Sequence, residues 1–466
     1  MRYFLWTVGC QMNEADSERI GRTLQDRGLT AAASIEQADV VILNTCSVRQ
    51  AAEEKAFGKV GSLRPLKVAR PDLIVAFGGC MVATDTVDKL RRRLPYVDVF
   101  FPPAEPGALL DLIDERMTDR DETIDGVSSE GCLAPTVVTA DGSVVSTTRP
   151  FPVARWLPIM TGCNRRCTYC IVPFRRGREV SRPIPELVAE TKRLVAEGAR
   201  EVTLLGQIVD RYGRDLRPDR PDLADLLTAL SEIDGLKRIR FLTSHPRDFT
   251  ERILDAVAAL PKVCEHINIP VQAGDDAILK AMWRGYTVDV YRKIVSRIRE
   301  RVPGCSIATD IIVGFPGESE EQFRRTLDLM EEIRFDVVHV AMYSPRPGTV
   351  AGDNMPDLLS PQEKKDRLHR VEEVQERISL ELNHALVGST EEILVEDQDH
   401  GKWKGRTRTN RLVFFDDPRH WLGRLALVRI ERASAWALQG VVVGGEEPGA
   451  TRPQWQPLPV LARARE

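Results

Sequence analysis

Six of the nine cysteines in this chain fall into two groups of three. Cys163, Cys167 and Cys170 form the tighter group, in which three residues and then two separate neighbouring cysteines. Thiolates this close together can bind three irons of a [4Fe–4S] cluster, and no fourth cysteine follows to close the site. The iron without a protein ligand can then bind a small reactive molecule, whereas a ferredoxin-type cluster with four thiolates only carries electrons. The spacing therefore predicts a catalytic iron–sulfur site.

A structural zinc site and a disulfide pair are the alternatives for this loop. Zinc usually takes four ligands and pairs its cysteines two to four residues apart, which this loop does not provide. The chain shows no apolar signal-peptide core at its start and no apolar run long enough to span a bilayer. We therefore expect a cytoplasmic protein without membrane attachment, in which thiols stay reduced and clustered cysteines serve metal binding or catalysis.

The other group of cysteines is dispersed, and its members follow three short apolar runs of the buried parallel-strand type. These strand candidates are 3–8, 39–43 and 73–77. A helical pattern lies in each interval, at 16–28 and at about 47–63. The alternation of strands and helices predicts right-handed crossovers and a parallel sheet.

One cysteine follows each of these strands within a few residues: Cys10, Cys46 and Cys80. Parallel strands bring their carboxyl ends to one edge of the sheet, where open α/β sheets bind their ligands. We therefore expect the three thiolates to converge and to hold a second cluster with one open position. The alternative is three ordinary buried cysteines, since free Cys is among the most buried residue types.

Composition and charge limit the possible classes of protein. The length of 466 residues predicts two to four domains. Hydrophobic residues make up 42% and charged residues 29%, as in a soluble globular protein with a large core. The net charge is only −4, so no overall field attracts the protein to a polyanion. Any nucleic-acid binding must therefore come from local patches.

The sequence pattern changes along the chain in a way that predicts several domains. Residues 1–116 form a first α/β domain, and the polar, acidic segment 117–148 is predicted as a linker. Residues 149–379 alternate six strand candidates with helical stretches, which predicts a partial barrel of parallel strands. The strand candidates are 157–160, 201–205, 238–243, 266–271, 306–313 and 337–343.

Polar residues follow the first four of these strands: Cys163, Gln207, Ser244 with His245, and Gln272. Catalytic residues of such barrels sit at the carboxyl ends of the strands, so one active site would explain all of them. The alternative for each residue taken alone is that it caps a loop.

Residues 380–448 show short strand patterns that suit a small antiparallel β-barrel, before a tail at 449–466. A helix at 360–385, opened by a capping box, precedes this barrel. The segment 402–411 holds five cations and no acid, so it is a candidate for phosphate binding, and its tryptophan could stack on a base. The alternative is a solvated hairpin. The predicted RNA contacts are Lys402, Trp403, Lys404, Arg406, Arg408 and Arg411.

These motifs together resemble the radical S-adenosylmethionine methylthiotransferases, and within them the tRNA-modifying MiaB group, over essentially the whole chain. The motifs that carry the resemblance are 9–13 (GCQMN), 44–49 (NTCSVR), 79–80 (GC), the Cys163 loop, 243–246 (TSHP), 309–317 (TDIIVGFPG) and 343–349 (YSPRPGT). The segment 405–407 resembles part of a TRAM domain, an RNA-binding barrel. The resemblance implies an α/β fold with an N-terminal parallel domain, a partial (β/α)6 radical-SAM barrel and a C-terminal antiparallel TRAM barrel.

The resemblance also implies two [4Fe–4S] clusters and S-adenosyl-L-methionine as cofactors. The cluster of the Cys163 loop would cleave S-adenosylmethionine reductively to a 5′-deoxyadenosyl radical, and the dispersed triad would hold or donate the sulfur. By position, the residues lining the S-adenosylmethionine pocket would be Tyr169, Gly206, Gln207 and Gln272. No general acid or base is expected, because attack on an unactivated aromatic C–H needs a radical, which cofactors supply.

The implied substrate is N6-isopentenyl(dimethylallyl)adenosine at position 37 of tRNA, converted to its 2-methylthio derivative. A second S-adenosylmethionine would supply the methyl group. An adenine of the anticodon loop can be splayed out, so an enzyme can reach it. The further partners implied are a reducing electron donor and a sulfur source.

Two alternatives keep the same chemistry and change the target, to threonylcarbamoyl-adenosine in tRNA or to an aspartate of a ribosomal protein. An alternative of another class is a non-catalytic RNA-binding protein whose cysteines hold structural metal. Three positions depart from the family pattern: Ile208, Ala273 and Trp283. They leave open whether the adenosine must carry an isopentenyl group.

Overall fold

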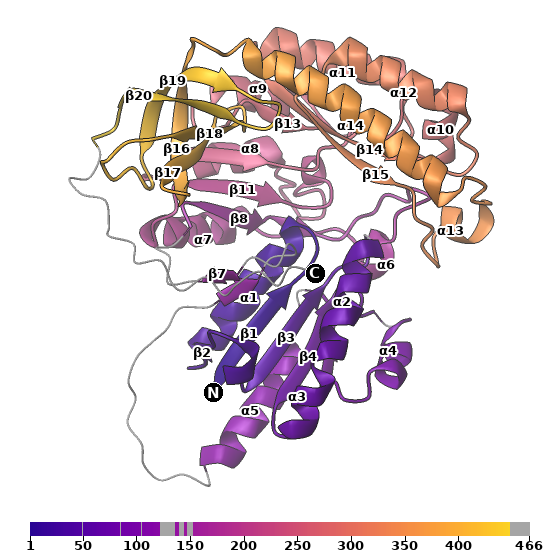
Figure 1. Ribbon diagram of the computed structural model, residues 1–466, viewed down its shortest axis with the longest axis vertical. Helices are drawn as coiled ribbons and strands as arrows, with labels where there is room; N and C mark the ends of the chain where they lie inside the picture. The colour runs from indigo at the N-terminus through magenta and orange to yellow at the C-terminus, as the bar shows by residue number, and fades with distance from the viewer. Residues whose placement is uncertain are drawn as a thin grey trace. The chain divides into compact units, whose positions relative to one another are not determined.

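The computed structural model describes residues 1–48, 50–83, 85–103, 105–121, 136–138, 144–146 and 152–447. The chain divides into two compact units, Met1–Gln375 and Glu376–Glu466. The first unit holds an N-terminal α/β domain and a larger barrel-like α/β domain, and the second holds a small β-barrel (Figure 1). No helix in the described part of the chain combines the length and the apolarity needed to cross a membrane.

The N-terminal domain is built on a mainly parallel sheet with the strand order β5-β4-β3-β1-β6-β7, in which β2 also pairs with β1. Its strands are β1 (Arg2–Thr7), β2 (Thr30–Ala31), β3 (Val40–Thr45), β4 (Ile74–Gly79), β5 (Val99–Phe101), β6 (Thr136–Val138) and β7 (Val144–Ser146). Its helices are α1 (Gln11–Asp26), η1 (Ile35–Gln37), α2 (Gln50–Ser62), α3 (Arg64–Ala69), α4 (Val87–Arg93) and α5 (Gly107–Asp121). The predicted parallel β-α-β-α-β arrangement is confirmed.

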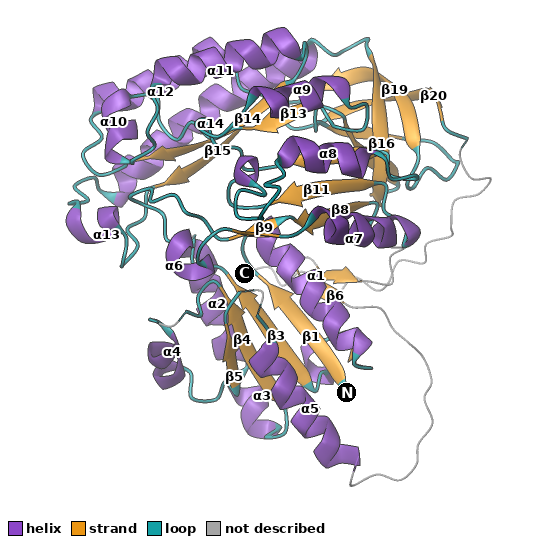
Figure 2. Cartoon of the chain, turned by 180° about the vertical axis from the view of Figure 1, so that it is seen from behind, coloured by secondary structure: helices purple, strands orange, loops and turns teal. Residues whose placement is uncertain are grey.

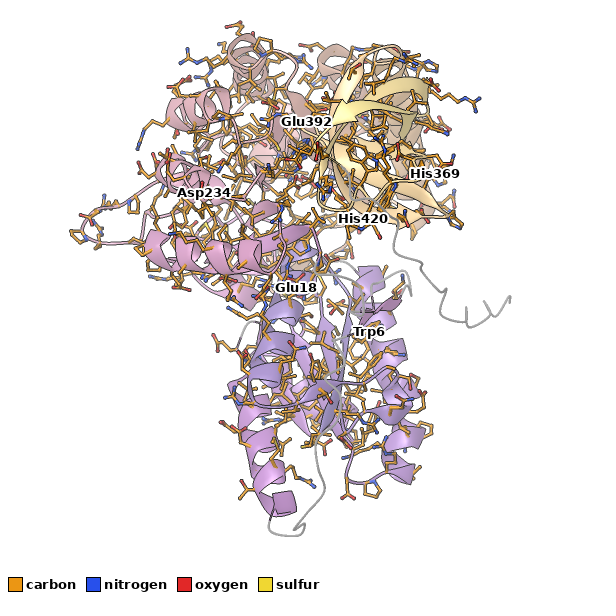
Figure 3. All side chains as sticks on the ribbon, turned by 90° about the vertical axis from the view of Figure 1, so that its left-hand side faces the viewer. Trp6, Glu18, Asp234, His369, Glu392 and His420 are labelled. Carbon is orange, nitrogen blue, oxygen red and sulfur yellow. The ribbon has the colours of Figure 1, made fainter. Side chains whose placement is uncertain are left out.

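Helices cover both faces of this sheet (Figures 1 and 2). Tyr3 and Leu5 of β1 pack with α1 and α5 on one face. Phe4 and Trp6, the latter labelled in Figure 3, pack with α2 on the other. Because both faces are covered, the central strands contain almost continuous apolar runs.

The segment 117–148, expected as a linker, differs from that expectation where it is described. Helix α5 runs into it as far as Asp121, and β6 and β7 extend the sheet, with β6 parallel to β1. Strands of three residues are too short to produce a periodic pattern, which is why sequence analysis did not predict them.

The second domain of this unit contains six parallel strands in two sheets, β12-β11-β8 and β13-β14-β15, linked by a bridge between Ile239 and Val263. The strands are β8 (Ala154–Pro158), β11 (Glu201–Leu205), β12 (Arg238–Phe241), β13 (His266–Asn268), β14 (Ser306–Val313) and β15 (Val337–Met342). The outer helices are α7 (Ile184–Ala196), α8 (Leu223–Ser231), α9 (Glu251–Ala259), α11 (Val288–Arg301) and α12 (Glu320–Ile333). The predicted partial (β/α)6 barrel is confirmed.

Short elements surround the carboxyl ends of these strands. They are the hairpin pair β9 (Met160–Thr161) and β10 (Val180–Ser181), together with α6 (Val172–Arg176), η2 (Val209–Arg211), α10 (Asp276–Ala281) and α13 (Val350–Asn354). The long helix α14 (Pro361–His384) follows and begins at the predicted capping box, in which Ser360 and Glu363 bond reciprocally.

Polar contacts join α1 of the N-terminal domain to β8 of the barrel. The indole Nε1 of Trp156 donates to Glu14 at 3.0 Å, and Arg155 pairs with Glu18 at 3.2 Å. Figure 3 shows Glu18 at this junction. The two domains of the first unit are thus tied together through helix α1, which directly follows Cys10.

The second unit is a closed five-stranded barrel with the order β16-β17-β18-β20-β19. Its strands are β16 (Thr390–Asp399), β17 (Lys402–Thr407), β18 (Leu412–Phe415), β19 (Leu425–Ala433) and β20 (Leu438–Gly445). Alternate residues of β16, such as Ile393 and Val395, point into a core that also holds Trp403 and Trp421. The predicted small antiparallel barrel is confirmed, apart from one parallel pair, β18 with β20.

Candidate functional site

The predicted loop triad, Cys163, Cys167 and Cys170, lies between β9 and α6, with all three residues half-buried. Backbone bonds fix the loop at both ends. The amide of Cys170 donates to the carbonyl of Cys167 at 3.0 Å, and the amide of Cys163 donates to the carbonyl of Gly177 at 3.0 Å. The three thiols are therefore presented by a defined backbone rather than by a loose loop.

Gly162 sets the path by which the chain enters this loop. Its φ is +77°, and a Cβ placed there would lie 1.9 Å from the carbonyl oxygen of Arg178. Only glycine accepts both the left-handed backbone and this close approach. The hairpin of β9 and β10 thus positions the first cysteine of the triad.

The thiols of the loop interact electrostatically. Burial raises the pKa of Cys163 to about 11 and that of Cys170 to about 12, and the Cys167 thiol adds to the rise in both. Ionising all three thiols together is therefore unfavourable unless a cation binds among them. Metal binding supplies that compensation, because the ligands must lose their protons as the metal binds.

Arg284, which the sequence did not single out, brings a positive charge to this loop. Its Nη1 donates to the Sγ of Cys167 at 3.6 Å, while its Nε and Nη2 donate to the Tyr286 hydroxyl and the Pro270 carbonyl, each at 3.2 Å. The guanidinium is buried, and these carbonyl and hydroxyl partners hold it in place. It therefore provides a fixed donor to a sulfur of the triad.

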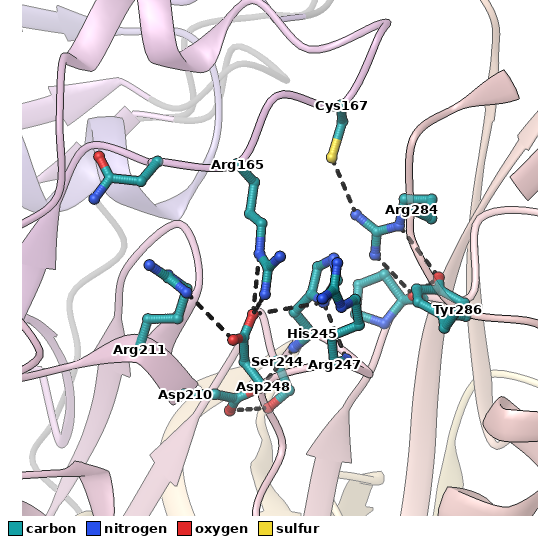
Figure 4. A network of polar contacts seen from close by, with 12 residues as sticks. Arg165, Cys167, Asp210, Arg211, Ser244, His245, Arg247, Asp248, Arg284 and Tyr286 are labelled. Atoms are coloured by element: carbon teal, nitrogen blue, oxygen red, sulfur yellow. Dashed lines mark hydrogen bonds and ion pairs between the residues drawn. The ribbon is translucent and has the colours of Figure 1, made fainter. Parts of the chain in front are cut away.

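A network of charged groups lies beneath the loop, at the ends of β11 and β12 (Figure 4). Asp248 is its centre, accepting from Arg165 Nε at 3.2 Å and from Arg211 Nη1 at 3.3 Å, with Arg214 at 3.2 Å. Burial alone would raise the pKa of Asp248, but Arg165 and then the other arginines lower it. Arg211 also pairs with Glu179 at 2.6 Å, so two carboxylates fix one guanidinium.

A second, less charged part of the network joins the ends of β11 and β12. Asp210 accepts from the Ser244 hydroxyl at 2.8 Å and from the His245 amide at 2.6 Å. Burial raises the pKa of Asp210 to about 7 and lowers that of His245 to about 3. Ser244 and His245 thus belong to a polar network, and its other members are residues that carry no pattern in the sequence. That Cys163, Gln207 and Gln272 share one site with them stays a prediction.

Gly206 and Gln207, predicted to line the cofactor pocket, follow β11 directly. A Cβ on Gly206 would lie 2.7 Å from the Cγ of Met160, so the backbone here packs directly against the hairpin. The Oε1 of Gln207 is buried and has no hydrogen-bond partner in the described part of the chain. A buried acceptor without a donor is costly, and a polar ligand would relieve that cost.

Tyr169 and Gln272, predicted for the same pocket, lie on the cysteine loop and beyond β13. Tyr169 packs edge-on against Phe315, with ring centroids 6.4 Å apart. Gln272 adopts a φ of +73°, and its amide donates to the carbonyl of Asp310 at 2.9 Å. The backbone strain at Gln272 is thus held by a bond to β14.

The three departures from the family pattern occupy different environments. Ile208 and Ala273 are buried, so their side chains alter the packing under the site. Trp283 is 56% exposed, and it follows Met282, whose carbonyl accepts from the amide of Thr168 in the cysteine loop. Of the three, Trp283 is the one that a substrate approaching the loop can touch.

The three cysteines of the dispersed triad lie at one edge of the sheet, as the topology predicted. Cys10, Cys46 and Cys80 follow β1, β3 and β4 at the same carboxyl edge. A Cβ on Gly9 would lie 2.7 Å from the Cβ of Cys46. Burial raises the pKa of Cys80 to about 12, and the Cys46 and Cys10 thiols add to that rise. The three thiols therefore lie close enough to interact.

A hydrogen-bonded set of amides lies behind this triad. Asn13 accepts from the Cys10 thiol at 3.3 Å and donates to the Thr45 carbonyl at 3.0 Å. Asn44 donates to the Asn13 carbonyl and to the Ser17 hydroxyl, each at 2.8 Å. Because these buried side chains tie α1 to β3, they fix the positions of the cysteines that follow β1 and β3.

Neither triad is arranged around the position of a single ion. Within the described ranges, no three His, Cys, Asp or Glu side chains converge closely enough to bind one metal ion. A [4Fe–4S] cluster uses a different iron for each thiolate, so its ligands stand apart around a larger group.

The cationic stretch of the second unit is only partly as expected. Trp403 is buried at 2% exposure and its Nε1 donates to the carbonyls of Asp417 and Arg419, so the prediction that it stacks on a base is wrong. Its alternation along β17 turns it into the barrel core. The exposed aromatic of this barrel is Trp436, at 68%.

Several cations of the same stretch have partners on the protein. Lys404 lies 3.4 Å from Asp397 and Arg406 lies 3.8 Å from Glu396, both on the paired strand β16. Arg411 donates to Asn383 at 2.9 Å. The net positive charge of this surface is therefore smaller than the sequence of 402–411 suggests, because the pairing of β16 with β17 places carboxylates beside the cations.

Comparison with known proteins agrees with this arrangement of three domains. Residues 157–330 match the Radical SAM superfamily, residues 2–102 match the Uncharacterized protein family UPF0004, and residues 384–443 match the TRAM domain. Among solved structures, the radical S-adenosylmethionine methyltransferase TsrM from Kitasatospora setae matches with a TM-score of 0.52 at 18% identity, covering 76% of this chain and 75% of that one. At that identity the likeness shows the fold.

Curated relatives match nearly the whole chain. The tRNA-2-methylthio-N(6)-dimethylallyladenosine synthase of Herpetosiphon aurantiacus is 47% identical over 95% of this chain and 98% of its own length. The protein of the same name from Moorella thermoacetica is 46% identical over 94% of this chain and 98% of its own. The chain belongs to the family of tRNA-2-methylthio-N(6)-dimethylallyladenosine synthases, which are radical S-adenosylmethionine methylthiotransferases.

Proposed function

We propose that this chain converts N6-(dimethylallyl)adenosine at position 37 of tRNA to its 2-methylthio derivative. The observation that carries the proposal is the pair of three-thiol sites, one at a sheet edge and one on a barrel loop, in a chain 47% identical to a synthase named for this product. Each site offers three protein ligands, which suits a cluster with one open iron.

The residues present fit two [4Fe–4S] clusters and S-adenosylmethionine. Cys163, Cys167 and Cys170 would hold one cluster, and the dispersed triad would hold the other. The coupled, half-buried thiols of the loop favour a group of positive charge, and the lack of convergence on one point suits a cluster better than zinc. The unpaired Oε1 of Gln207 suits a polar cofactor lying across the strand ends.

A cluster with S-adenosylmethionine, when bound, supplies the radical chemistry that attack on an aromatic C–H requires. The chain's own residues provide position and shielding. Arg284 directs a fixed donor at the Cys167 sulfur, and the Asp248 network holds the strand ends in place beneath the loop. No acid–base pair is needed, so the strand-end carboxylates serve to orient neighbours.

RNA contact is assigned to the second unit, as its TRAM match suggests. We propose that Lys402, Lys404, Arg406, Arg408 and Arg411 contribute charge toward phosphates. The exposed Trp436 takes the stacking role that the buried Trp403 does not fill.

The reaction also needs partners that the chain does not contain. Reductive cleavage consumes an electron, so an electron donor must act on the loop cluster. Each product carries one new sulfur, so a sulfur source must replenish the site of the dispersed triad. We propose that the reaction takes place in the cytoplasm, where tRNA is available.

Nucleoside analysis of tRNA from cells with and without this protein tests the proposal. We expect 2-methylthio-N6-(dimethylallyl)adenosine only when the protein is present. Unchanged content of this nucleoside rejects the substrate, and a gain of methylthio-threonylcarbamoyl-adenosine or of a modified ribosomal aspartate identifies one of the alternative targets.

The non-catalytic alternative is tested with the reconstituted protein. Two clusters correspond to about eight irons per chain. We expect reduction in the presence of S-adenosylmethionine to yield 5′-deoxyadenosine. A protein that binds tRNA, yields none and keeps its tRNA affinity after Cys163→Ala would be an RNA-binding protein with structural metal.

A further inference from the structure

Arg176, at the end of α6, has a buried side chain that forms an ion pair with α1. It is the last residue of α6, six positions after Cys170. Its side chain is 4% exposed, and its Nη2 donates at 2.9 Å to Asp16, whose side chain is 5% exposed. Asp16 lies on α1, six positions after Cys10. One ion pair therefore joins the segment that follows one triad to the helix that follows the other.

The guanidinium of Arg176 is not fully used by this ion pair. Its Nη1 is buried and has no hydrogen-bond partner in the described part of the chain. A buried, charged N–H without an acceptor costs more free energy than a neutral one. An acceptor bound beside Arg176 would satisfy this N–H.

The charges around Arg176 indicate where that acceptor lies. After burial, Arg176 has the largest influence on the pKa of Cys80 and acts to lower it. Burial acts to lower the pKa of Arg176 itself, but Asp16 and then the Cys80 and Cys10 thiols outweigh it, so that the pKa is raised. The guanidinium thus lies within electrostatic reach of the dispersed triad.

We infer that Arg176 is a positioning residue for the dispersed triad: its Nη1 donates a hydrogen bond to a sulfur, thiolate or sulfide, of the cluster held there. The inference rests on the proposed function, since it requires a cluster at Cys10, Cys46 and Cys80. Asp16 accepts from Nη2 and so orients the guanidinium, which leaves Nη1 available to donate to the sulfur. The segment that begins with the loop triad then sets the electronic properties of the other cluster.

A buried cation beside a cluster stabilises its reduced state, because reduction adds negative charge. Hydrogen bonds to the sulfurs act in the same direction and are among the factors that set cluster potentials. Removing Arg176 should therefore make the reduction potential of this cluster more negative. A purely structural role in joining the two domains predicts no such shift.

The test uses the full chain with Cys163, Cys167 and Cys170 replaced by alanine, which leaves only the cluster of the dispersed triad. Potentiometric titration followed by electron paramagnetic resonance gives its reduction potential. In Arg176→Gln we expect the ratio of reduced to oxidised cluster at a fixed potential to fall at least tenfold, a shift of about 59 mV for one electron.

Arg175 provides a matched control on the neighbouring position. It also reaches from α6 to the N-terminal domain, but its partner is the exposed Asp85. Arg175→Gln should leave the potential unchanged. The potential of Arg176→Lys should fall between those of the parent and Arg176→Gln. Lysine keeps a positive charge beside Asp16 but lacks the second donor nitrogen that would face the sulfur. Arg175→Lys is its control.

The outcomes separate this inference from the proposed function. If the reduction potential of the cluster is the same in each Arg176 variant as in its Arg175 control, the inference is refuted and the proposed function is not affected. If Arg176→Gln does not retain iron, the reduction potentials of Arg176→Lys and Arg175→Lys are compared instead, and equal values refute the inference. A parent without any iron at the dispersed triad overturns the proposed function and this inference together.

Discussion

The Asp210→Asn substitution would test the electrostatics of the strand-end network. Asp210 is buried, and burial raises its pKa to about 7. When protonated, one carboxyl oxygen can donate to the Ser244 hydroxyl while the other accepts from the His245 amide. An asparagine side chain offers the same donor and acceptor, so the variant imitates the neutral form of Asp210 without disturbing its partners.

The sign of the effect follows from the raised pKa. In the unfolded chain Asp210 ionises near its ordinary pKa of 3.8, whereas in the folded protein it keeps its proton until about pH 7. Stability from this residue is therefore fully present below the unfolded pKa and is lost as pH rises toward the folded pKa. Between pH 5 and pH 8 the loss amounts to about 2–3 kcal/mol, at 1.36 kcal/mol per pKa unit.

Urea unfolding of the metal-free protein at pH 5 and pH 8 measures this loss. The free energy of unfolding of Asp210→Asn, relative to the unsubstituted protein, should increase by about 2–3 kcal/mol between the two pH values. The titration of His245 is common to both proteins and cancels in the difference. Asp234→Asn, in an exposed turn, should show no such increase. An equal pH dependence in Asp210→Asn and the unsubstituted protein would refute the assignment of a neutral, buried Asp210.

Three further predictions concern the two triads and the RNA-binding barrel. The first is made in a variant without the dispersed triad, where Gly162→Ala should lower the iron content because the added Cβ would clash with the Arg178 carbonyl. Gly177→Ala should keep most of the iron, because the space around a Cβ at that position is open. Cys10→Ala should abolish methylthiolation of tRNA yet leave formation of 5′-deoxyadenosine largely intact, as product analysis would show. Trp436→Ala should weaken tRNA binding without changing its salt dependence, whereas neutralising the cations of β17 should both weaken binding and flatten its dependence on salt.

Each of these has a distinct contrary outcome. Equal iron loss in the two glycine variants would mean that the positive φ, and not the close approach, governs the loop. Loss of 5′-deoxyadenosine in Cys10→Ala would contradict the division of labour between the triads. A salt slope that stays the same after the β17 cations are neutralised would move the phosphate contacts to another surface.

The sequence by itself determined the identity of the thiol ligands proposed here and the order of the domains. Cysteine spacing in the loop is a local property, and the placement of one cysteine after each parallel strand follows from the topology of such sheets. The apolar runs predicted the buried strands, and the capping residues predicted where helices begin. For these features the local pattern and the global fold agree.

The tertiary structure alone decided which side chains surround those thiols. Asp248 meets Arg165 across 83 residues and Arg176 meets Asp16 across 160, and charged residues at such separations carry no periodic signal. The same reason explains the wrong prediction for Trp403. In the sequence a tryptophan among cations suggests an exposed side chain, but the alternation of side chains along the strand and the closure of the barrel turn it into the core. Long-range contacts depend on how strands register and helices pack, so only folding brings the arginines, carboxylates and sulfurs together.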